Sequence, residues 1–186
     1  MTKDQFWSII EEVHRASHGD MDKKCDLLRD RLSKLDAGGI RDFRAHFDEC
    51  DRRAFDWGLW GAAYIIHGGC GDDSFSDFRS TLISHGREIF ERALVDPDSL
   101  ADLPLTEETA CYEGYAYVVT EPEEKISRES APSGTPFPSE PSGKAWDEDD
   151  DKMLAQRFPR LHSKHGRSLP RSGGGTAEKK PWWRIW

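Results

Sequence analysis

The chain lacks a long hydrophobic run: of its 186 residues, the longest uninterrupted apolar stretch is LWGAAYII at positions 59–66. A membrane-spanning helix needs roughly 20 such residues. It has only four cysteines, spaced singly without a Cys-x-x-Cys pair, which argues against a disulfide framework or a zinc ribbon. The first residues, MTKDQFWSIIEE, carry no basic-then-apolar leader pattern. These absences predict a cytoplasmic protein with reduced thiols and no transmembrane segment.

Acidic residues are scarce at the end of the chain and abundant elsewhere. Residues 152–186 hold nine Lys or Arg and one acid, Glu178, whereas the other 151 residues carry a net charge of −17. An acidic body repels phosphate groups, so we expect no nucleic-acid binding from it. The terminal KKPWWRIW combines cations with three tryptophans. It could contact a partner or an anionic surface, although an idle or self-docking tail explains it as well.

Apolar residues recur at helical spacing from the start of the chain. The pattern predicts amphipathic helices over residues 3–17, 21–35 and 40–54. Thr2 and Gln5 form a capping box before the first of them. These helices have charged residues on their other faces, which is typical of a bundle with one shared core.

Glycine-rich segments are expected to separate the helices. Asp36-Ala-Gly-Gly39 marks the end of the second predicted helix. Residues 57–66 are apolar nearly all round, which predicts a central helix, and His67-Gly68-Gly69 should end it. Any of residues 72–74 can cap the next helical region, which continues with a break near Gly86 to residue 94.

The rest of the chain divides into a last core helix and appendages. Residues 1–121 are expected to form a helical core domain, although Tyr and Val enrichment near its end leaves a strand open there. Residues 122–145 form a Pro/Ser/Gly-rich linker, 146–163 an acidic-capped helix docked on the core, and 164–186 a disordered basic tail. The fold class predicted is all-α, a compact bundle of about six or seven helices.

The segment HGGCGDDSF, residues 67–75, concentrates residues that bind ligands in other proteins. Glycines before a helix can hold a phosphate, but Asp72 and Asp73 occupy the place where the phosphate would lie and no Lys follows. His67 and Cys70 are possible metal ligands, yet no second cluster completes a set of three or four. We therefore expect a tight turn between helices, with no metal and no cofactor.

Aromatic side chains gather on both sides of this turn. Aromatics at helical spacing are usually core, and Arg79 is expected to pair with a nearby carboxylate. The other interpretation is a groove lined by Trp60 and Tyr64, with Arg79 and His67 at its rim, that holds a carboxylate-bearing or aromatic ligand or a partner peptide. The candidate ligand or partner patch comprises Trp57, Trp60, Tyr64, His67, Asp72, Asp73, Arg79 and Arg87.

A second group of polar residues suggests acid–base chemistry. Asp42, His46 and Glu49 share one face of the third predicted helix, and a histidine between carboxylates can act as a general base. Four neighbouring arginines favour a solvated charged face instead. The chain has no nucleophile elbow and no HExxH pattern, so an enzyme is the weaker hypothesis.

Three segments are similar to those of a known family. They are FWSIIEE at residues 6–12, the long block from WGLWGAAYIIHGGCGDD onward at 57–103, and WDEDDDKMLAQRFPRL at 146–161. They resemble a bacterial family known only as a domain of unknown function, DUF4240. The resemblance implies no activity, cofactor or catalytic residue. It implies a signature that contains Trp60-Gly61, Gly68-Gly69-Cys70, Asp72-Asp73, Phe78-Arg79 and Gly86-Arg87.

Taken together, these features predict a cytoplasmic bacterial protein of the interaction or binding type, without enzymatic activity. Its partner, a protein or a small molecule, would use the aromatic patch between Trp57 and Arg79. The alternative is a small metal-dependent or hydrolytic enzyme centred on His67, Asp72, Asp73 and Arg79.

Overall fold

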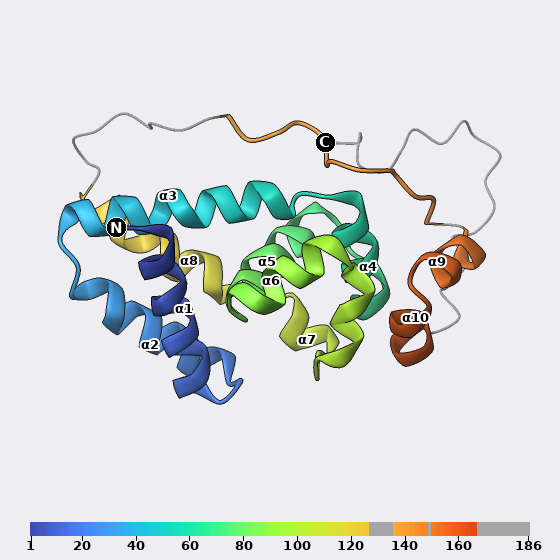
Figure 1. Ribbon diagram of the computed structural model, residues 1–186, viewed down its shortest axis with the longest axis horizontal. Helices are drawn as coiled ribbons and strands as arrows, with labels where there is room; N and C mark the ends of the chain where they lie inside the picture. Colours follow the sequence, from blue (N-terminus) through green and yellow to red (C-terminus); the bar gives the residue numbers. More distant parts are fainter. Residues whose placement is uncertain (127–135, 149, 167–186) are drawn as a thin grey trace.

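The computed structural model describes residues 1–126, 136–148 and 150–166, and over these residues the chain is helical without a β-sheet (Figure 1). The all-α prediction is therefore confirmed. In chain order the helices are α1 (Lys3–Ser17), α2 (Met21–Ser33), α3 (Ala37–Ala54), α4 (Trp57–His67), α5 (Asp72–Ile83), α6 (Arg87–Val95), the 3-10 helix η1 (Pro97–Asp102), α7 (Glu107–Ala110), α8 (Gly114–Ile126), α9 (Asp151–Arg157) and α10 (Pro159–His165).

The helices form an elongated bundle (Figure 1). Helices α1 and α2 pack against each other at one end, where α8 also contacts α2. Helix α3 runs along one side and contacts α5 and α8. Helices α9 and α10 lie at the opposite end, and α10 packs against α4 and η1. One continuous apolar core joins the two ends.

The helix starts follow the capping residues. Thr2 and Gln5 make both hydrogen bonds of the predicted capping box. The end predicted for the second helix at residues 36–39 is wrong, because α2 already stops at Ser33. The Asp36 carboxylate accepts a hydrogen bond from the Gly39 N–H at 2.7 Å, so these residues begin α3 instead.

The helices near residues 72 and 106 also differ in detail from the prediction. Helix α5 has Gly71 as its N-cap, so Asp72 and Asp73 lie within its first turn rather than capping it. The last core helix of the prediction is divided into α7 and α8 by Cys111 and the residues after it. The strand alternative for this region does not occur.

The segment predicted as a linker is attached to the core near its end. Its first residues continue α8 to Ile126, and residues 127–135 lie outside the described residues. Ser142 forms an isolated bridge beside Asp56: its N–H donates to Phe55 O and its carbonyl accepts from Trp57 N–H, each at 2.9 Å. This contact attaches the segment before Trp146 to the start of α4.

The predicted docking of the C-terminal helix is present, with the helix divided into α9 and α10 at Phe158. The Trp146 indole N–H donates to Trp57 O at 2.8 Å. Gly61 allows α4 to pack closely against Phe158, because a Cβ at this position would lie 2.7 Å from the Phe158 ring. Leu154, Phe158 and Leu161 are buried. Of the tail predicted to be disordered, residues 167–186 lie outside the described residues.

Asp98 of η1 fixes the start of α10. Its carboxylate accepts hydrogen bonds from the backbone N–H groups of Arg160 and Leu161 at 3.0 and 2.9 Å. A buried carboxylate at the positive end of a helix is a stabilising arrangement. In the part of the chain that the structure describes, each helix is too short or too polar to cross a bilayer.

Candidate functional site

The glycine-rich segment after α4 is a tight turn. Gly68 adopts a left-handed conformation with φ of 74°, and Gly69 N–H donates to Tyr64 O at 2.9 Å, which closes the helix. The His67 ring nitrogen Nδ1 donates to Gly69 O at 2.6 Å. The Asp72 and Asp73 side chains are exposed in the first turn of α5. His67 is therefore engaged by its own turn.

The aromatic residues of the predicted patch are packed into the core. Trp60 stacks between Trp57 and Phe75, with ring centroids 5.3 and 4.6 Å away. Its indole N–H donates to Cys70 O at 2.9 Å. Trp57 and Trp60 are 6% and 2% exposed. Tyr64 is half-buried and its ring lies 4.9 Å from that of Trp146. The segment that follows the linker thus covers the face where a groove would open.

Arg79 is a buried cation with its charge balanced. It is 5% exposed, and its guanidinium donates to both Asp51 oxygens, with Nε 2.8 Å from Oδ1. It also lies over the Phe75 and Phe55 rings, 4.8 and 5.1 Å from their centroids. The expected pairing with a carboxylate is correct, but the partner comes from α3 rather than from the neighbouring turn.

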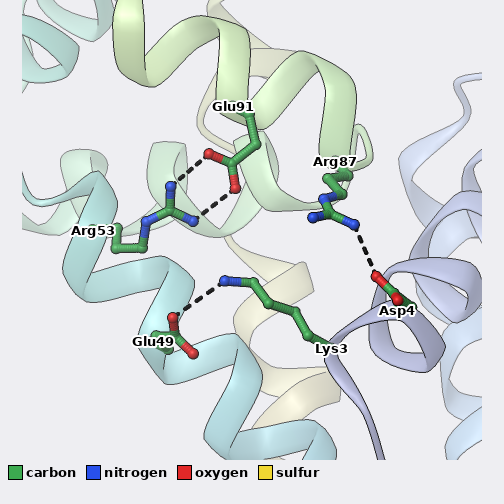
Figure 2. A network of polar contacts seen from close by, with 6 residues as sticks. All are labelled: Lys3, Asp4, Glu49, Arg53, Arg87 and Glu91. Carbon is green, nitrogen blue, oxygen red and sulfur yellow. Dashed lines mark hydrogen bonds and ion pairs between the residues drawn. The ribbon is translucent and has the colours of Figure 1, made fainter.

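Arg87 lies apart from the other predicted site residues, in a polar network that joins α1, α3 and α6 (Figure 2). It donates to Asp4 at 2.9 Å, while the preceding residue of α1, Lys3, contacts Glu49 at 3.3 Å. In the same network Arg53 forms a two-bonded pair with Glu91, which raises the pKa of Arg53 and lowers that of Glu91. These contacts link α1, α3 and α6 at the partly exposed surface of the bundle.

The predicted patch is therefore not one accessible surface in this structure. Trp57, Trp60 and Arg79 belong to the core, because stacking and ion pairing bury them. Asp72 and Asp73 are exposed on α5. Of the predicted acid–base group, His46 contacts Met1 O and Glu49 contacts Lys3. Within residues 1–126, 136–148 and 150–166, no three His, Cys, Asp or Glu side chains come together as a metal site would require.

An accessible groove of about 560 Å³ lies beside the glycine turn. We call it the α7 groove. It lies where α4 ends, α7 begins and α10 ends. Glu107 and Glu108, both exposed, stand in the first turn of α7. The groove is lined by Ile66, Gly68, Leu105, Thr106, Glu107, Glu108, Lys164, His165 and Gly166.

The two walls of the α7 groove differ in charge. Thr106 and Thr109 form a capping box that holds the two glutamates at the start of α7. On the opposite wall, the Lys164 ammonium donates to the carbonyls of Ala101 and Leu103, so its donors are directed at the backbone. The groove lining thus carries the two carboxylates of Glu107 and Glu108 and the ammonium of Lys164, so acid is in excess, and Ile66 and Leu105 supply its apolar floor.

A polar cluster in the interior was not predicted from the sequence. Lys24 of α2 is fully buried, and its ammonium donates to the Ser84 hydroxyl at 3.0 Å. Beside it the His14 and His85 rings lie 5.3 Å apart, and His14 Nδ1 and His85 Nε2 are buried without a hydrogen-bond partner among the described residues. We call these four residues the Lys24 cluster.

Burial changes the protonation of the Lys24 cluster. It lowers the pKa of Lys24 to about 8, since the charged form is poorly solvated there. It also lowers the pKa of His85 to about 3, and the nearby ammonium of Lys24 adds to this effect. The pKa of His14 is lowered for the same two reasons. One sequence signal was available: Lys24 lies between Met21 and Leu28 on the apolar face of its helix.

The fold and these contacts define a small helical protein that encloses ionisable residues in its core and has a groove with an excess of acid on its surface. The family model described as "Protein of unknown function (DUF4240)" matches residues 1–124, and the chain belongs to that family. No curated protein and no solved structure matches the chain. The family match ends within α8, so Trp146, α9 and α10 lie beyond it.

Proposed function

We propose that this protein is a non-enzymatic interaction module that binds a basic segment of a partner protein in the α7 groove. The observation that carries the proposal is the groove itself, which combines two exposed carboxylates with an apolar floor. A segment with cationic and apolar side chains complements both features.

The overall charge supports the same type of partner. The chain carries a formal net charge of −9, and the excess of acid lies outside residues 152–186. A field of this sign attracts basic segments and repels nucleic acids. We therefore propose no nucleic-acid partner for the body. The basic tail is a possible competitor for the groove, and the experiment below separates it from an external partner.

The aromatic patch and the enzyme alternative receive less support from the geometry. An enzyme centred on His67, Asp72, Asp73 and Arg79 needs these side chains to converge on one substrate. Instead His67 contacts Gly69 and Arg79 contacts Asp51 across the core. A binding patch at Trp60 would need a large opening of the core.

We further propose that the protein is bacterial and acts in the cytoplasm. All four cysteines are free thiols in the structure, and three of them are buried. Free thiols are the usual state in a reducing compartment. Fractionation of the native cell would test this proposal, which fails if the protein is recovered outside the cytoplasm.

Binding to the α7 groove can be tested with a defined probe. A fluorescein-labelled octapeptide of alternating lysine and leucine is titrated with the full chain at low salt, and fluorescence anisotropy is recorded. Glu107→Lys/Glu108→Lys should weaken binding by about tenfold, which corresponds to about 1.4 kcal/mol. The control Asp72→Lys/Asp73→Lys makes the same charge change in the first turn of α5 and should weaken binding by less than about threefold.

Two results would overturn the proposal. Equal losses in both variants would mean that the peptide responds only to net charge. Stronger binding by Trp182→Ser/Trp183→Ser, which alters the tail and leaves the net charge of −9 unchanged, would mean that the chain's own tail occupies the groove instead of a partner.

A further inference from the structure

Residues 136–143, which we call the strap, form a segment without helical turns that is attached beside the start of α4 (Figure 1). The Ser142 N–H donates to Phe55 O, and the Trp57 N–H donates to Ser142 O, each at 2.9 Å. This parallel bridge uses main-chain atoms of the strap, and main-chain pairing of this kind is one way in which proteins recognise extended peptides. The strap is therefore held as a peptide ligand would be held.

Two side-chain contacts add selectivity to the main-chain pairing. The Phe137 ring lies 5.0 Å from the Phe55 ring, between ring centroids, and the Arg79 guanidinium carbon lies 5.4 Å from the centroid of Phe137. An aromatic side chain of the strap thus meets both a ring and a cation. Five positions later, the Ser142 hydroxyl donates to Asp56 Oδ2 at 2.9 Å. This face of the core therefore recognises an aromatic residue and a serine at a fixed spacing.

The position after Ser142 requires glycine. Gly143 has a φ of 83°, which residues with a side chain rarely adopt. A Cβ there would also lie 2.6 Å from Asp56 Oδ2. Together with Phe137 and Ser142, this glycine defines the pattern aromatic-x4-Ser-Gly for a segment that fits the face.

The strap is buried far less than the residues that it covers. Phe137 is 46% exposed, Pro141 is half-buried and the other strap residues are exposed. Full burial begins again at Trp146, which is 5% exposed. A segment with so little buried surface is expected to open locally, without unfolding of the bundle.

The charge of Arg79 stays balanced when the strap opens. Its guanidinium donates to both oxygens of Asp51, at 2.8 and 3.4 Å, and Asp51 belongs to α3 rather than to the strap. Trp60 also stays stacked against its two aromatic neighbours of the core. Opening therefore uncovers the Phe55 ring and the outer face of Arg79, and it avoids the cost of an unpaired buried charge.

We propose that Phe55, the Trp57 N–H and Arg79 form a docking site for an extended segment of a partner protein with the pattern aromatic-x4-Ser-Gly. The strap occupies this site until the partner displaces it. The docking residues lie within residues 1–124, which the family model matches, whereas the strap lies beyond them. The site shares no lining residue with the α7 groove, and the proposal does not depend on the proposed function.

A peptide with the sequence of the strap provides the probe. Fluorescein-labelled PFPSEPSGKA, residues 136–145, is titrated with the full chain and with Phe137→Ala/Gly143→Ala, and fluorescence anisotropy is recorded. The variant weakens the strap at exposed positions and frees the site, so it should bind the peptide at least about tenfold more tightly than the unmodified chain. Two control peptides, with alanine in place of the phenylalanine or of the glycine, should bind the variant at least about tenfold more weakly.

Hydrogen exchange of the unmodified chain tests the opening itself. The Ser142 N–H donates across the bridge to Phe55 O. It should exchange at least about 100-fold faster than the most protected helical amides, because the strap opens locally. Equal exchange rates would mean that the strap opens only when the whole bundle unfolds, and they would overturn the proposal.

Three results of the titration would also overturn it: no binding by the variant, equal binding by the variant and the unmodified chain, or equal binding of the control peptides. A dimer of the unmodified chain in light scattering that the variant lacks would assign the site to a second copy of the chain instead. The peptide carries one Glu and one Lys, and Glu107→Lys/Glu108→Lys should leave its binding unchanged. A failure here is therefore distinguishable from a failure of the α7 groove.

Discussion

The interior around Arg79 and the interior around Lys24 both bury a cation, but only Arg79 has a counter-charge. Arg79 is paired with Asp51 and enclosed by aromatic rings. Lys24 contacts the neutral Ser84 hydroxyl and lies beside two histidines. The first region is rich in residues that suggest a binding site and is nevertheless a closed core. The second is inconspicuous in the sequence and contains the polar groups whose burial is costly.

The largest expected effect comes from opening the aromatic core. Trp60→Ala removes a stacked ring and the hydrogen bond to Cys70 O, so it should lower the free energy of unfolding by about 3–5 kcal/mol. The change in the free energy of unfolding is measured by urea denaturation. Tyr117→Ala, at a residue that is 62% exposed, should change stability by less than about 0.5 kcal/mol. Similar values for the two variants would mean that Trp60 is not part of the core.

The second-largest loss of stability is expected when the carboxylate that pairs with Arg79 is removed. Asp51→Asn leaves a buried guanidinium without a carboxylate and should cost about 2–3 kcal/mol, below the usual range for a fully buried pair because Asp51 is 22% exposed. Asp26→Asn removes the partner of Arg29 in an exposed pair and should cost less than about 0.5 kcal/mol. The difference between the two variants in urea denaturation is the quantity to measure. Equal costs would refute the enclosed environment of Arg79.

The Lys24 cluster should make the protein sensitive to acid. The pKa of His85 is lowered from 6.5 to about 3. Between these two pH values His85 is therefore mostly protonated in the unfolded state and mostly neutral in the folded state. The contribution of His85 to stability is complete above pH 6.5 and is lost as the pH falls toward 3. Between pH 7 and pH 5 the loss should be about 2 kcal/mol, with His14 acting in the same direction.

His85→Gln tests the origin of this acid sensitivity, because glutamine does not titrate. Its unfolding free energy, measured from pH 7 to pH 5, should fall less steeply than that of the unmodified protein. Parallel pH curves for the two proteins would assign the sensitivity to carboxylates elsewhere.

The smallest expected effect is a gain in stability rather than a loss. Lys24→Met keeps an apolar stem and removes an ammonium that burial disfavours, so stability at pH 7 should rise by about 1 kcal/mol. Lys23→Met changes the neighbouring exposed lysine and should be neutral within about 0.5 kcal/mol. For the unmodified protein, stability should also rise between pH 8 and pH 10.5 as Lys24 loses its proton. Destabilisation by Lys24→Met would show that the ammonium makes contacts that favour folding.

Local patterns in the sequence predicted the helices better than the boundaries between them. The capping box of Thr2 and Gln5 and the left-handed Gly68 depend on residues close in sequence, and both are found. The role of Asp36 was missed because the glycines after it resemble a helix end, while its carboxylate begins the next helix. Whether such a residue ends one helix or begins the next depends on which backbone N–H group donates a hydrogen bond to its side chain.

The candidate site depended on contacts that no local pattern contains. Asp51 reaches Arg79 from α3, and Trp146 covers Tyr64 from beyond the predicted linker. Because of these two contacts, the face that was predicted to form a groove is covered, and Arg79 is enclosed in the core. The α7 groove was missed for the same reason, because α10 supplies one of its walls from about 60 residues further along the chain. Long-range packing decides which of the polar residues are accessible.

Hydrogen exchange of the Trp60 indole N–H, followed by NMR on the full chain labelled with nitrogen-15, tests most directly whether the aromatic patch is closed. This group is buried and donates to Cys70 O. Its exchange should therefore be as slow as that of the most protected helical amides and should require global unfolding. Rapid exchange of the Trp60 indole while those amides stay protected would contradict the closed core and would return the patch between Trp57 and Arg79 to the status of an accessible site.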